Sequence, residues 1–553
     1  MTRLLRFSVG FPLAATLLVA AGAAAQPAQP ATKLQEGLAA LEARQFGPAA
    51  AALRAAVEQD PGSLQAHEGF IQASVLAAME KEPSPIPLPG TPFADDGVTA
   101  PKTRAMPAGS GPAGKDLRAI YEAWLAKYPG TAAVEWGLGK VLVDIDQALA
   151  EAHLQKALAI EARSAPAYRD LATLAFLRKQ PEQRAAYLLK AKESAPGDPA
   201  YAMAYAMAIY GTDKAAAQPL LQDVLTRFPK DKAAMSALIY LSALSATPEE
   251  RKGWLERLWT GFPGAQGRNS SLKQLFALYA RDYDPKALDL ARDMVKTYPA
   301  DKEWPLELDA EAQILRAHAL VLEKKYADAE AMLAKLTLPV RMDALPYHVL
   351  KAEAMGAGDP AKAYAALMTA AVPEPRDPIE AALKTYGARL GKSPAQVDDE
   401  LWAERYAKAT PFKDFELTDY RTGKPVKLSD YRGRVVLVNF WFPGCGPCRA
   451  EFPMLQEALT KYGPKGFAVL AINIVTEEDD QVVPLLDEGK YGFTALKMPT
   501  EDWAKVHYGI KGAPVNFLLD TEGKIIFRPQ INDTLSHRAF LKAVESLVAR
   551  GKQ

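Results

Sequence analysis

Residues 441–453 read Trp-Phe-Pro-Gly-Cys-Gly-Pro-Cys-Arg-Ala-Glu-Phe-Pro and contain both cysteines of the chain, Cys445 and Cys448. The apolar run 435–440 predicts a buried strand because it is rich in β-branched residues. The helical spacing of 450–462 places the cysteines where a strand passes into a helix. A thiol at a helix N-terminus lies near the positive end of the helix dipole, which favours the thiolate. We therefore expect a redox-active disulfide in which Cys445 is the nucleophile and Cys448 resolves the mixed disulfide.

Other uses of a Cys-x-x-Cys pair fit the sequence less well. A structural zinc site needs four ligands, but there is no second cysteine pair and the six histidines show no ligand spacing. A purely structural disulfide across so short a loop would contribute little stability. A thiol peroxidase also uses an activated cysteine after a strand, but its usual upstream Pro and Thr are replaced by Val438 and Phe442. We expect neither a metal nor another cofactor.

Length, charge and the first residues bound the class of protein. With 553 residues, 49% hydrophobic content and zero formal net charge, the chain is expected to form several folded domains and to have no nucleic-acid partner. Residues 1–25 contain Arg3 and Arg6, then an apolar run from Phe7 to Ala21, and end in Ala23-Ala24-Ala25, the pattern of a secretory signal peptide. An uncleaved membrane anchor is the alternative. We expect an exported, periplasmic protein, in a compartment where disulfides persist.

Residues 26–378 are rich in Ala and Leu, with helical periodicity and almost no strand signals. Helix-breaking prolines recur at positions 61, 129, 196, 229, 263, 299, 339 and 373. Their spacing is mostly near one or two lengths of about 34 residues, and the pattern resembles the tetratricopeptide family. The resemblance implies a solenoid of stacked helix pairs with a protein-binding surface. An irregular helical bundle is the alternative for the fold, and a simple spacer is the alternative for the role.

Two segments depart from the repeat pattern. Residues 81–115 contain eight prolines and several glycines, which predict a loop or extended insertion. Residues 379–410 predict a helical connector between the two domains. Within this connector, Ser393-Pro394-Ala395-Gln396 has the pattern of a capping box with proline at the first helical position.

From Pro411 the sequence alternates between strand-like and helical runs, which predicts an α/β domain over 411–553. The expected strands are 435–440, 467–475, 493–498, 514–519 and 524–528, and the expected helices are 450–462, 480–488 and 535–549. Several ordered motifs resemble the thioredoxin superfamily, and most of all the TlpA/ResA branch of exported thiol–disulfide oxidoreductases. They include Val438-Asn439-Phe440-Trp441, Cys445-Gly446-Pro447-Cys448, Glu451-Phe452-Pro453 and Gly512-Ala513-Pro514. The chain is thus expected to join an all-α tetratricopeptide-like solenoid to a thioredoxin-fold domain.

The resemblance implies roles for residues around the cysteines. Pro514 is expected to be cis, to lie against the cysteines and to present the backbone of Ala513 to a substrate strand. Asn439 stands where thioredoxin has a buried Asp and cannot act as a base. Glu451 matches a family glutamate that could take the proton of Cys448, provided that burial raises its pKa. The alternative is an acidic residue favoured only by the helix dipole.

The sequence also assigns roles to the other residues of the cysteine loop and to His507. Gly444 stands where most relatives have Trp or another bulky residue, so we expect an open rim around Cys445 and an altered choice of substrate. Trp441 is expected to be part of the core wall, Arg449 a solvated side chain and His507 a helix-surface residue. The alternative for Arg449 is that its charge lowers the pKa of the cysteine thiol. Gly446 and Pro447 complete the active-site loop.

These features predict an exported thiol–disulfide oxidoreductase that reduces protein disulfides and binds clients or partners through its helical repeats. The Gly-Pro dipeptide between the cysteines is that of thioredoxin, whose reduction potential is about −270 mV. A reductase needs an electron-donating thiol protein, for which a membrane-bound partner is one candidate. The alternatives are a non-enzymatic adaptor with a docking thioredoxin-like module and, more weakly, a thiol peroxidase.

Overall fold

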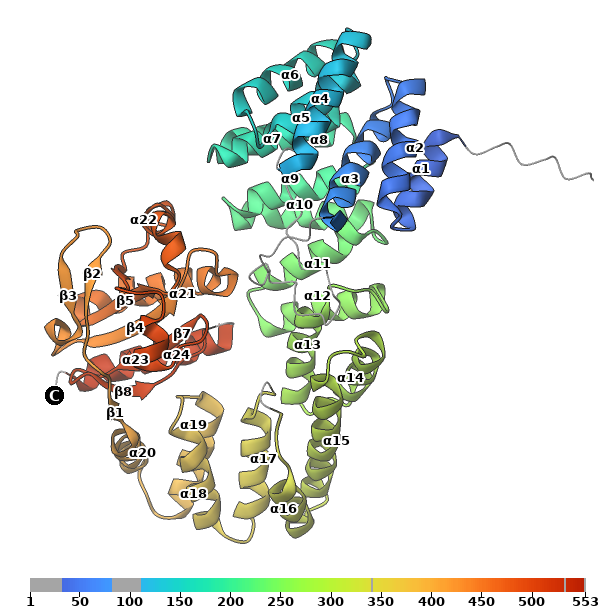
Figure 1. Cartoon of the computed structure of the whole chain (residues 1–553). Helices are drawn as coiled ribbons and strands as arrows, with labels where there is room; N and C mark the ends of the chain where they lie inside the picture. Colours follow the sequence, from blue (N-terminus) through green and yellow to red (C-terminus); the bar gives the residue numbers. More distant parts are fainter. Residues whose placement is uncertain (1–31, 82–110, 340–341, 532–533, 552–553) are drawn as a thin grey trace, which may run out of the picture. The chain divides into compact units, whose positions relative to one another are not determined.

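The computed structural model describes residues 32–81, 111–339, 342–531 and 534–551 (Figure 1). The predicted signal peptide and most of the predicted proline-rich insertion lie outside these residues. Helix α4 (Gly111–Lys127) begins inside the range predicted for the insertion, so residues 111–115 are helical and not extended. Pro112 lies in the first turn of this helix, where the missing N–H costs no hydrogen bond. Within the described ranges, no helix is long and apolar enough to cross a membrane.

The described residues before Thr410 form helices and no strands, as the sequence predicts. The chain is divided into two compact units. Among the described residues, the first unit ends at Leu174 and the second begins at Ala175. The first unit contains α1 (Lys33–Glu42), α2 (Phe46–Gln59), α3 (Leu64–Lys81), α4, α5 (Ala132–Leu142), α6 (Gln147–Ile160) and most of α7 (Ala165–Leu177). Helices of the second unit are α8 (Pro181–Ser194), α9 (Pro199–Tyr210), α10 (Lys214–Arg227), α11 (Lys232–Leu244), α12 (Pro248–Gly261), α13 (Asn269–Arg281), α14 (Lys286–Thr297), α15 (Glu303–Leu322), α16 (Tyr326–Lys335), α17 (Leu345–Gly356), α18 (Pro360–Ala371), α19 (Asp377–Arg389) and α20 (Pro394–Lys408).

Small residues allow neighbouring helices of this region to approach closely. A Cβ atom at Gly37 of α1 would lie 2.4 Å from Leu53 Cγ of α2, and one at Gly356 of α17 would lie 2.1 Å from the Tyr386 ring of α19. The breaker prolines follow the even-numbered helices α2, α4, α8, α10, α12, α14, α16 and α18. Proline ends these helices because it cannot continue the hydrogen-bond ladder. The predicted all-α region is therefore confirmed, while its assignment to tetratricopeptide repeats stays a prediction.

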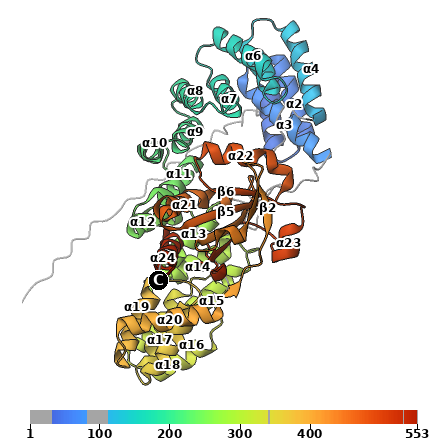
Figure 2. The same cartoon turned by 90° about the vertical axis from the view of Figure 1, so that its left-hand side faces the viewer.

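The C-terminal domain is built on a mixed sheet of eight strands in the order β1-β8-β7-β4-β5-β6-β2-β3. The strands are β1 (Thr410–Pro411), β2 (Glu416–Asp419), β3 (Pro425–Lys427), β4 (Val435–Trp441), β5 (Phe467–Asn473), β6 (Thr494–Lys497), β7 (Val515–Leu519) and β8 (Lys524–Phe527). Strand β4 pairs in parallel with β5 and antiparallel with β7. On the other side of β4 the order continues through β5 and β6 to β2, which are labelled in Figure 2. The three short strands before β4 were not predicted.

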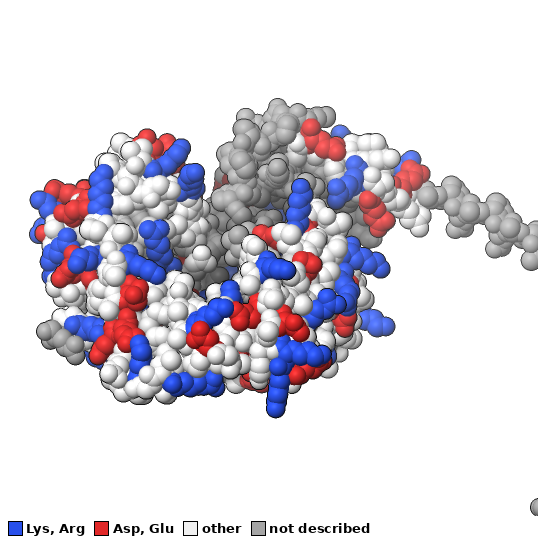
Figure 3. Space-filling model, turned by 90° about the horizontal axis from the view of Figure 1, so that it is seen from below, with Lys and Arg blue, Asp and Glu red and all other residues white. Residues whose placement is uncertain are grey.

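Helices cover both faces of this sheet. Helices α21 (Gly446–Tyr462), α22 (Asp479–Glu488) and α24 (Thr534–Arg550) pack on one face, in an apolar cluster with alternate residues of β4 such as Val435 and Leu437. Val436 and Val438 point to the opposite face, where the cluster includes Ala504 of the short helix α23 (Trp503–Tyr508). The predicted thioredoxin-like α/β domain is confirmed. On the face shown in Figure 3, basic and acidic side chains are interspersed, in keeping with zero net charge.

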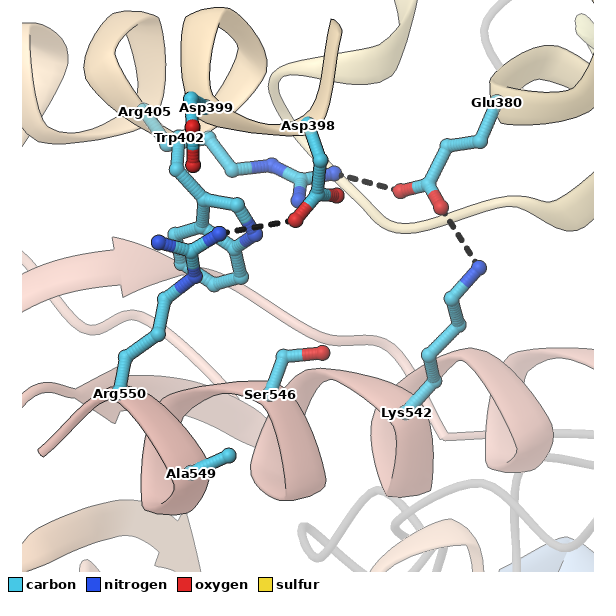
Figure 4. A pocket seen from close by; sticks show the side chains of 9 residues that line it. All are labelled: Glu380, Asp398, Asp399, Trp402, Arg405, Lys542, Ser546, Ala549 and Arg550. Carbon is cyan, nitrogen blue, oxygen red and sulfur yellow. Dashed lines mark hydrogen bonds and ion pairs between the residues drawn. The ribbon is translucent and has the colours of Figure 1, made fainter. Parts of the chain in front are cut away.

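A charged network joins helices α19 and α20 to α24 (Figure 4). Glu380 accepts a hydrogen bond from Arg405 at 2.9 Å and another from Lys542 at 2.6 Å. Arg550 donates to Asp398 at 2.8 Å. These side chains, together with Trp402, line a pocket of about 360 Å³. The capping box predicted at Ser393, at the start of α20, is confirmed.

Candidate active site

The two cysteines lie at the junction of β4 and α21, as predicted. Cys445 is the N-cap residue of α21, and its Sγ accepts a hydrogen bond from the backbone N–H of Cys448 at 3.2 Å. The two residues form a disulfide with 5.3 Å between their Cα atoms. Cys445 is 4% exposed and Cys448 is fully buried. The structure therefore shows the oxidised form, in which both cysteines are buried and Cys445 is slightly more exposed than Cys448.

The loop that presents the cysteines is short and held by backbone hydrogen bonds. The N–H of Cys445 donates to the Phe442 carbonyl at 3.0 Å, and the N–H of Arg449 donates to the Cys445 carbonyl at 3.1 Å. Pro447 occupies the first turn of α21, where proline is compatible with the helix. Strand β4 is buried along its whole length, which fixes the point at which this loop begins.

The loop before β7 contains the predicted cis bond between Ala513 and Pro514. Ala513 is partly buried and packs against the apolar cluster that includes both cysteines. Because β7 is paired with β4, the Ala513–Pro514 loop and the cysteine loop meet at the same end of the sheet. The cis geometry is confirmed, whereas the pairing of Ala513 with a substrate strand stays a prediction.

Glu451 is buried one turn after Cys448 on α21. It is 3% exposed, and its Oε2 accepts a hydrogen bond from Asn516 Nδ2 at 3.1 Å. Asn439, the cross-strand partner of Asn516, donates from its own Nδ2 to Asn516 Oδ1 at 2.8 Å. Residues three apart on a helix share a face, so Glu451 lies on the side of α21 that carries Cys448.

Burial raises the pKa of Glu451 to about 7, although hydrogen bonds from Asn516 and from the backbone of Ile531 act in the opposite direction. Desolvation disfavours the charged form of a carboxyl group. Glu451 therefore has the raised pKa that a proton-transfer role requires. Asn516 was not predicted, since only the pairing of β7 with β4 brings it to Glu451.

The rim beside Gly444 is not open, contrary to prediction. The Glu478 carboxylate fills this space, and its Oε2 accepts a hydrogen bond from the Gly444 N–H at 2.6 Å. A Cβ atom at Gly444 would lie 2.9 Å from Glu478 Oε1. Sequence reasoning missed Glu478 because it lies 34 residues away, in the turn η3 (Thr476–Glu478) after β5.

The remaining predicted site residues differ in how deeply they are buried. Trp441 is fully buried and packs edge to face on Phe452, with 4.8 Å between ring centroids, as expected for a core wall. Arg449 is exposed on α21, and His507 is exposed on α23, both as predicted. Gly446 begins α21 directly after Cys445. Among the described residues, no group of three or more His, Cys, Asp or Glu side chains could hold a metal ion.

Comparison with known proteins finds relatives of the C-terminal domain. Residues 409–528 match the profile of the AhpC/TSA family. Over 135 residues the chain is 32% identical to the thiol-disulfide oxidoreductase ResA of Geobacillus thermodenitrificans. The aligned segment covers 24% of this chain and 74% of that protein. The ResA protein of Bacillus thuringiensis is 34% identical over 117 residues, covering 20% of this chain and 64% of its own.

Solved structures are similar to about a quarter of the chain. The thioredoxin domain of a thiol-disulfide oxidoreductase from Bacteroides vulgatus is 28% identical, with a TM-score of 0.23. The match covers 25% of this chain and 96% of that structure. Residues 409–528, which match the family profile, include the Cys445–Cys448 disulfide, and helices α1–α20 precede them.

Proposed function

The chain belongs to the ResA family of thiol-disulfide oxidoreductases, and from this premise we propose that it is an exported reductase of protein disulfides. The observation that carries the proposal is the disulfide at the N-terminus of α21, with a buried carboxyl group of raised pKa, Glu451, one turn further along the same helix. A helix N-terminus stabilises the thiolate that attacks a disulfide.

The reaction is thiol–disulfide exchange. In the reduced protein, the Cys445 thiolate attacks one sulfur of a substrate disulfide. The substrate S–S bond breaks, a mixed disulfide forms, and the first substrate sulfur leaves as a thiolate that takes up a proton. The Cys448 thiolate then attacks Cys445 Sγ and releases the second substrate sulfur. Two electrons pass to the substrate, and the protein returns to the disulfide form seen here.

In the second step, Glu451 is proposed to accept the proton of the Cys448 thiol. Cys448 is fully buried, so water has little access to its thiol. A carboxyl with a pKa of about 7 can accept this proton at neutral pH and release it again. Its hydrogen bond to Asn516 holds the acceptor oxygen in place. The function assigned to Glu451 is therefore general acid–base catalysis within the dithiol centre.

The direction and partners belong to the same proposal. The Gly-Pro dipeptide between the cysteines favours reduction, as in thioredoxin. The protein then needs a thiol donor that reduces Cys445–Cys448 after each cycle, and disulfide-containing proteins as clients. The helical pairs before Thr410 are proposed to bind one of these partners, since such arrays present extended protein-binding surfaces.

Turnover of a protein disulfide tests the proposal. The full chain should reduce insulin disulfides with dithiothreitol as electron donor, and Cys445→Ser should abolish the catalysed rate. Equal turnover by the wild type and Cys445→Ser would instead favour an adaptor in which the thioredoxin-like domain only docks. A Cys448→Ala variant should trap clients as covalent adducts at Cys445, because the resolving thiol is absent.

A further inference from the structure

Two loops meet at the end of the sheet that carries the disulfide. Trp441, the last residue of β4, is the register partner of Asn473, the last residue of the parallel strand β5. Because parallel strands end at the same edge of a sheet, the segments that follow them are neighbours. One segment contains Gly444 and Cys445, and the other contains Glu478. The hydrogen bond from Gly444 N–H to Glu478 Oε2, at 2.6 Å, joins the two.

The loop that carries Glu478 is held firmly. The buried Asn473 side chain donates to the Val475 carbonyl at 2.8 Å and to Asp479 Oδ1 at 2.9 Å. Its Oδ1 accepts from the Val475 N–H at 3.1 Å. Lys497 forms an ion pair with the other oxygen of Asp479 at 2.8 Å. The position of Glu478 is therefore fixed by the fold around it and not by its own side chain alone.

Glycine at position 444 is what admits this carboxylate. A Cβ atom there would lie 2.9 Å and 3.2 Å from the two carboxylate oxygens of Glu478, so the carboxylate would have to move to make room for it. The carboxylate thus occupies the space in which a larger residue would stand, directly before the nucleophilic cysteine. Gly444 and Glu478 therefore pack closely against each other across the two loops.

A negative charge one residue from Cys445 opposes the effect of the helix terminus. The α21 dipole stabilises a thiolate at its N-terminus, whereas a nearby carboxylate disfavours a second negative charge. Stabilising the reduced form makes a dithiol pair more oxidising, as in DsbA. A carboxylate that destabilises the thiolate must therefore make the pair more reducing.

We propose that Glu478 is a positioning residue that holds the Cys445–Cys448 pair at a reducing potential through its contact with Gly444. This inference rests on the proposed function and adds what sets the direction of exchange. The carboxylate acts through its charge and through the backbone of the residue before the nucleophile. It takes no part in the transfer of electrons or protons.

Redox equilibrium of the full chain with glutathione at one fixed pH tests this role. Glu478→Gln keeps an acceptor oxygen for the Gly444 N–H but removes the charge. It should shift the equilibrium toward the dithiol by at least about threefold, which corresponds to about 14 mV for a two-electron couple. Glu477→Gln is the matched control, because Glu477 is exposed in the same turn and loses the same charge. The control should leave the equilibrium constant within experimental scatter.

A double-mutant cycle separates the paired contact from a general effect of charge. Gly444→Ala should displace the carboxylate and shift the equilibrium in the same direction, and combining it with Glu478→Gln should add little further. The inference is overturned if Glu478→Gln leaves the constant unchanged, or if Glu477→Gln shifts it equally. A wild-type chain that does not exchange with glutathione at all would instead refute the proposed function. Thermal melting of each variant checks that the fold is retained.

Discussion

The side-chain amide of Asn516 donates a hydrogen bond to the buried carboxyl group of Glu451, with 3.1 Å between Nδ2 and Oε2. The same amide accepts a hydrogen bond from Asn439 through its oxygen, so its orientation is fixed by the neighbouring strand. A carboxyl oxygen can accept this bond in either protonation state. Glu451 can therefore gain and lose a proton without losing its support.

Replacing Glu451 with Gln should slow reduction of a substrate disulfide at pH 7 by at least about tenfold, because positioned acid–base groups contribute about 10²–10⁴-fold. Since burial raises the pKa of Glu451 to about 7, the wild-type rate should show an inflection near that pH. The variant should lack the inflection. Stopped-flow measurement of the exchange rate between pH 5 and 9 checks both outcomes, and an unchanged profile would leave Glu451 with only a structural role.

The contact from Asn516 should set where this inflection falls. The hydrogen bond stabilises the ionised carboxylate and so lowers the pKa of Glu451 from the value that burial alone would give. Asn516→Ala should therefore move the inflection of the rate profile to higher pH. In the double variant with Glu451→Gln the inflection should be absent. A shift to lower pH would contradict the assigned direction of this hydrogen bond.

Glu311 in the helical region predicts a pH dependence of stability. It is fully buried on α15, both of its oxygens are without a hydrogen-bond partner in the described structure, and burial raises its pKa to about 7. The unfolded state has the ordinary value of 4.5, so the native state binds more protons between these two pH values. The associated stability is present below about pH 4.5 and is lost as the pH rises through about 7.

Glu311→Gln should therefore raise the Tm at pH 8 and have little effect at pH 4.5. The upper limit of the gain is about 3 kcal/mol, at about 1.4 kcal/mol for each pKa unit. Asp309→Asn is the matched control on the same helix, since Asp309 is exposed. Thermal unfolding followed by circular dichroism at both pH values gives the comparison. Equal Tm changes at pH 4.5 and pH 8 would show that ionisation of Glu311 is not involved.

Glu380 should be the main polar contributor to the contact between α19, α20 and α24. It bridges Arg405 and Lys542, and the Arg405 side chain is only 2% exposed. Removing one partner of a buried pair leaves an uncompensated charge and costs about 3–5 kcal/mol. Glu380→Gln should thus lower the Tm markedly while disulfide exchange at Cys445 continues.

Asp398→Asn provides the comparison at the same contact. Asp398 pairs with Arg550, but its side chain is 44% exposed, and exposed pairs contribute only about 0–1 kcal/mol. Urea unfolding and limited proteolysis of the two variants should therefore differ clearly. Similar destabilisation by both substitutions would show that burial of Glu380 does not decide the strength of this contact.

Local sequence patterns predicted the fold well where one segment determines its own structure. The buried run of β4, the cysteines before α21 and the cis bond at Pro514 are examples, because each follows from consecutive residues or from a short motif. The strands β1–β3 were missed since they span only two to four residues each. Such short segments carry too few apolar residues to indicate a strand.

Contacts between distant segments escaped prediction. Asn516 reaches Glu451 because β7 pairs with β4, and Glu478 reaches Gly444 because β5 lies parallel to β4. The order of strands in a sheet cannot be predicted from the sequence of each strand alone. No short sequence motif therefore indicates either contact. The open rim expected at Gly444 was wrong for this reason. A glycine shows where space is available, but the sheet topology decides which side chain fills it.

The central claim is that Cys445 attacks disulfides and Cys448 resolves the product. The most direct test is mass spectrometry of the full-length Cys448→Ala variant after incubation with oxidised glutathione. The account predicts one glutathione adduct per chain, located at Cys445 and released by dithiothreitol, whereas the wild type returns to its internal disulfide. A variant that forms no adduct at Cys445, although the thiol is reduced and the protein is folded, would contradict the account.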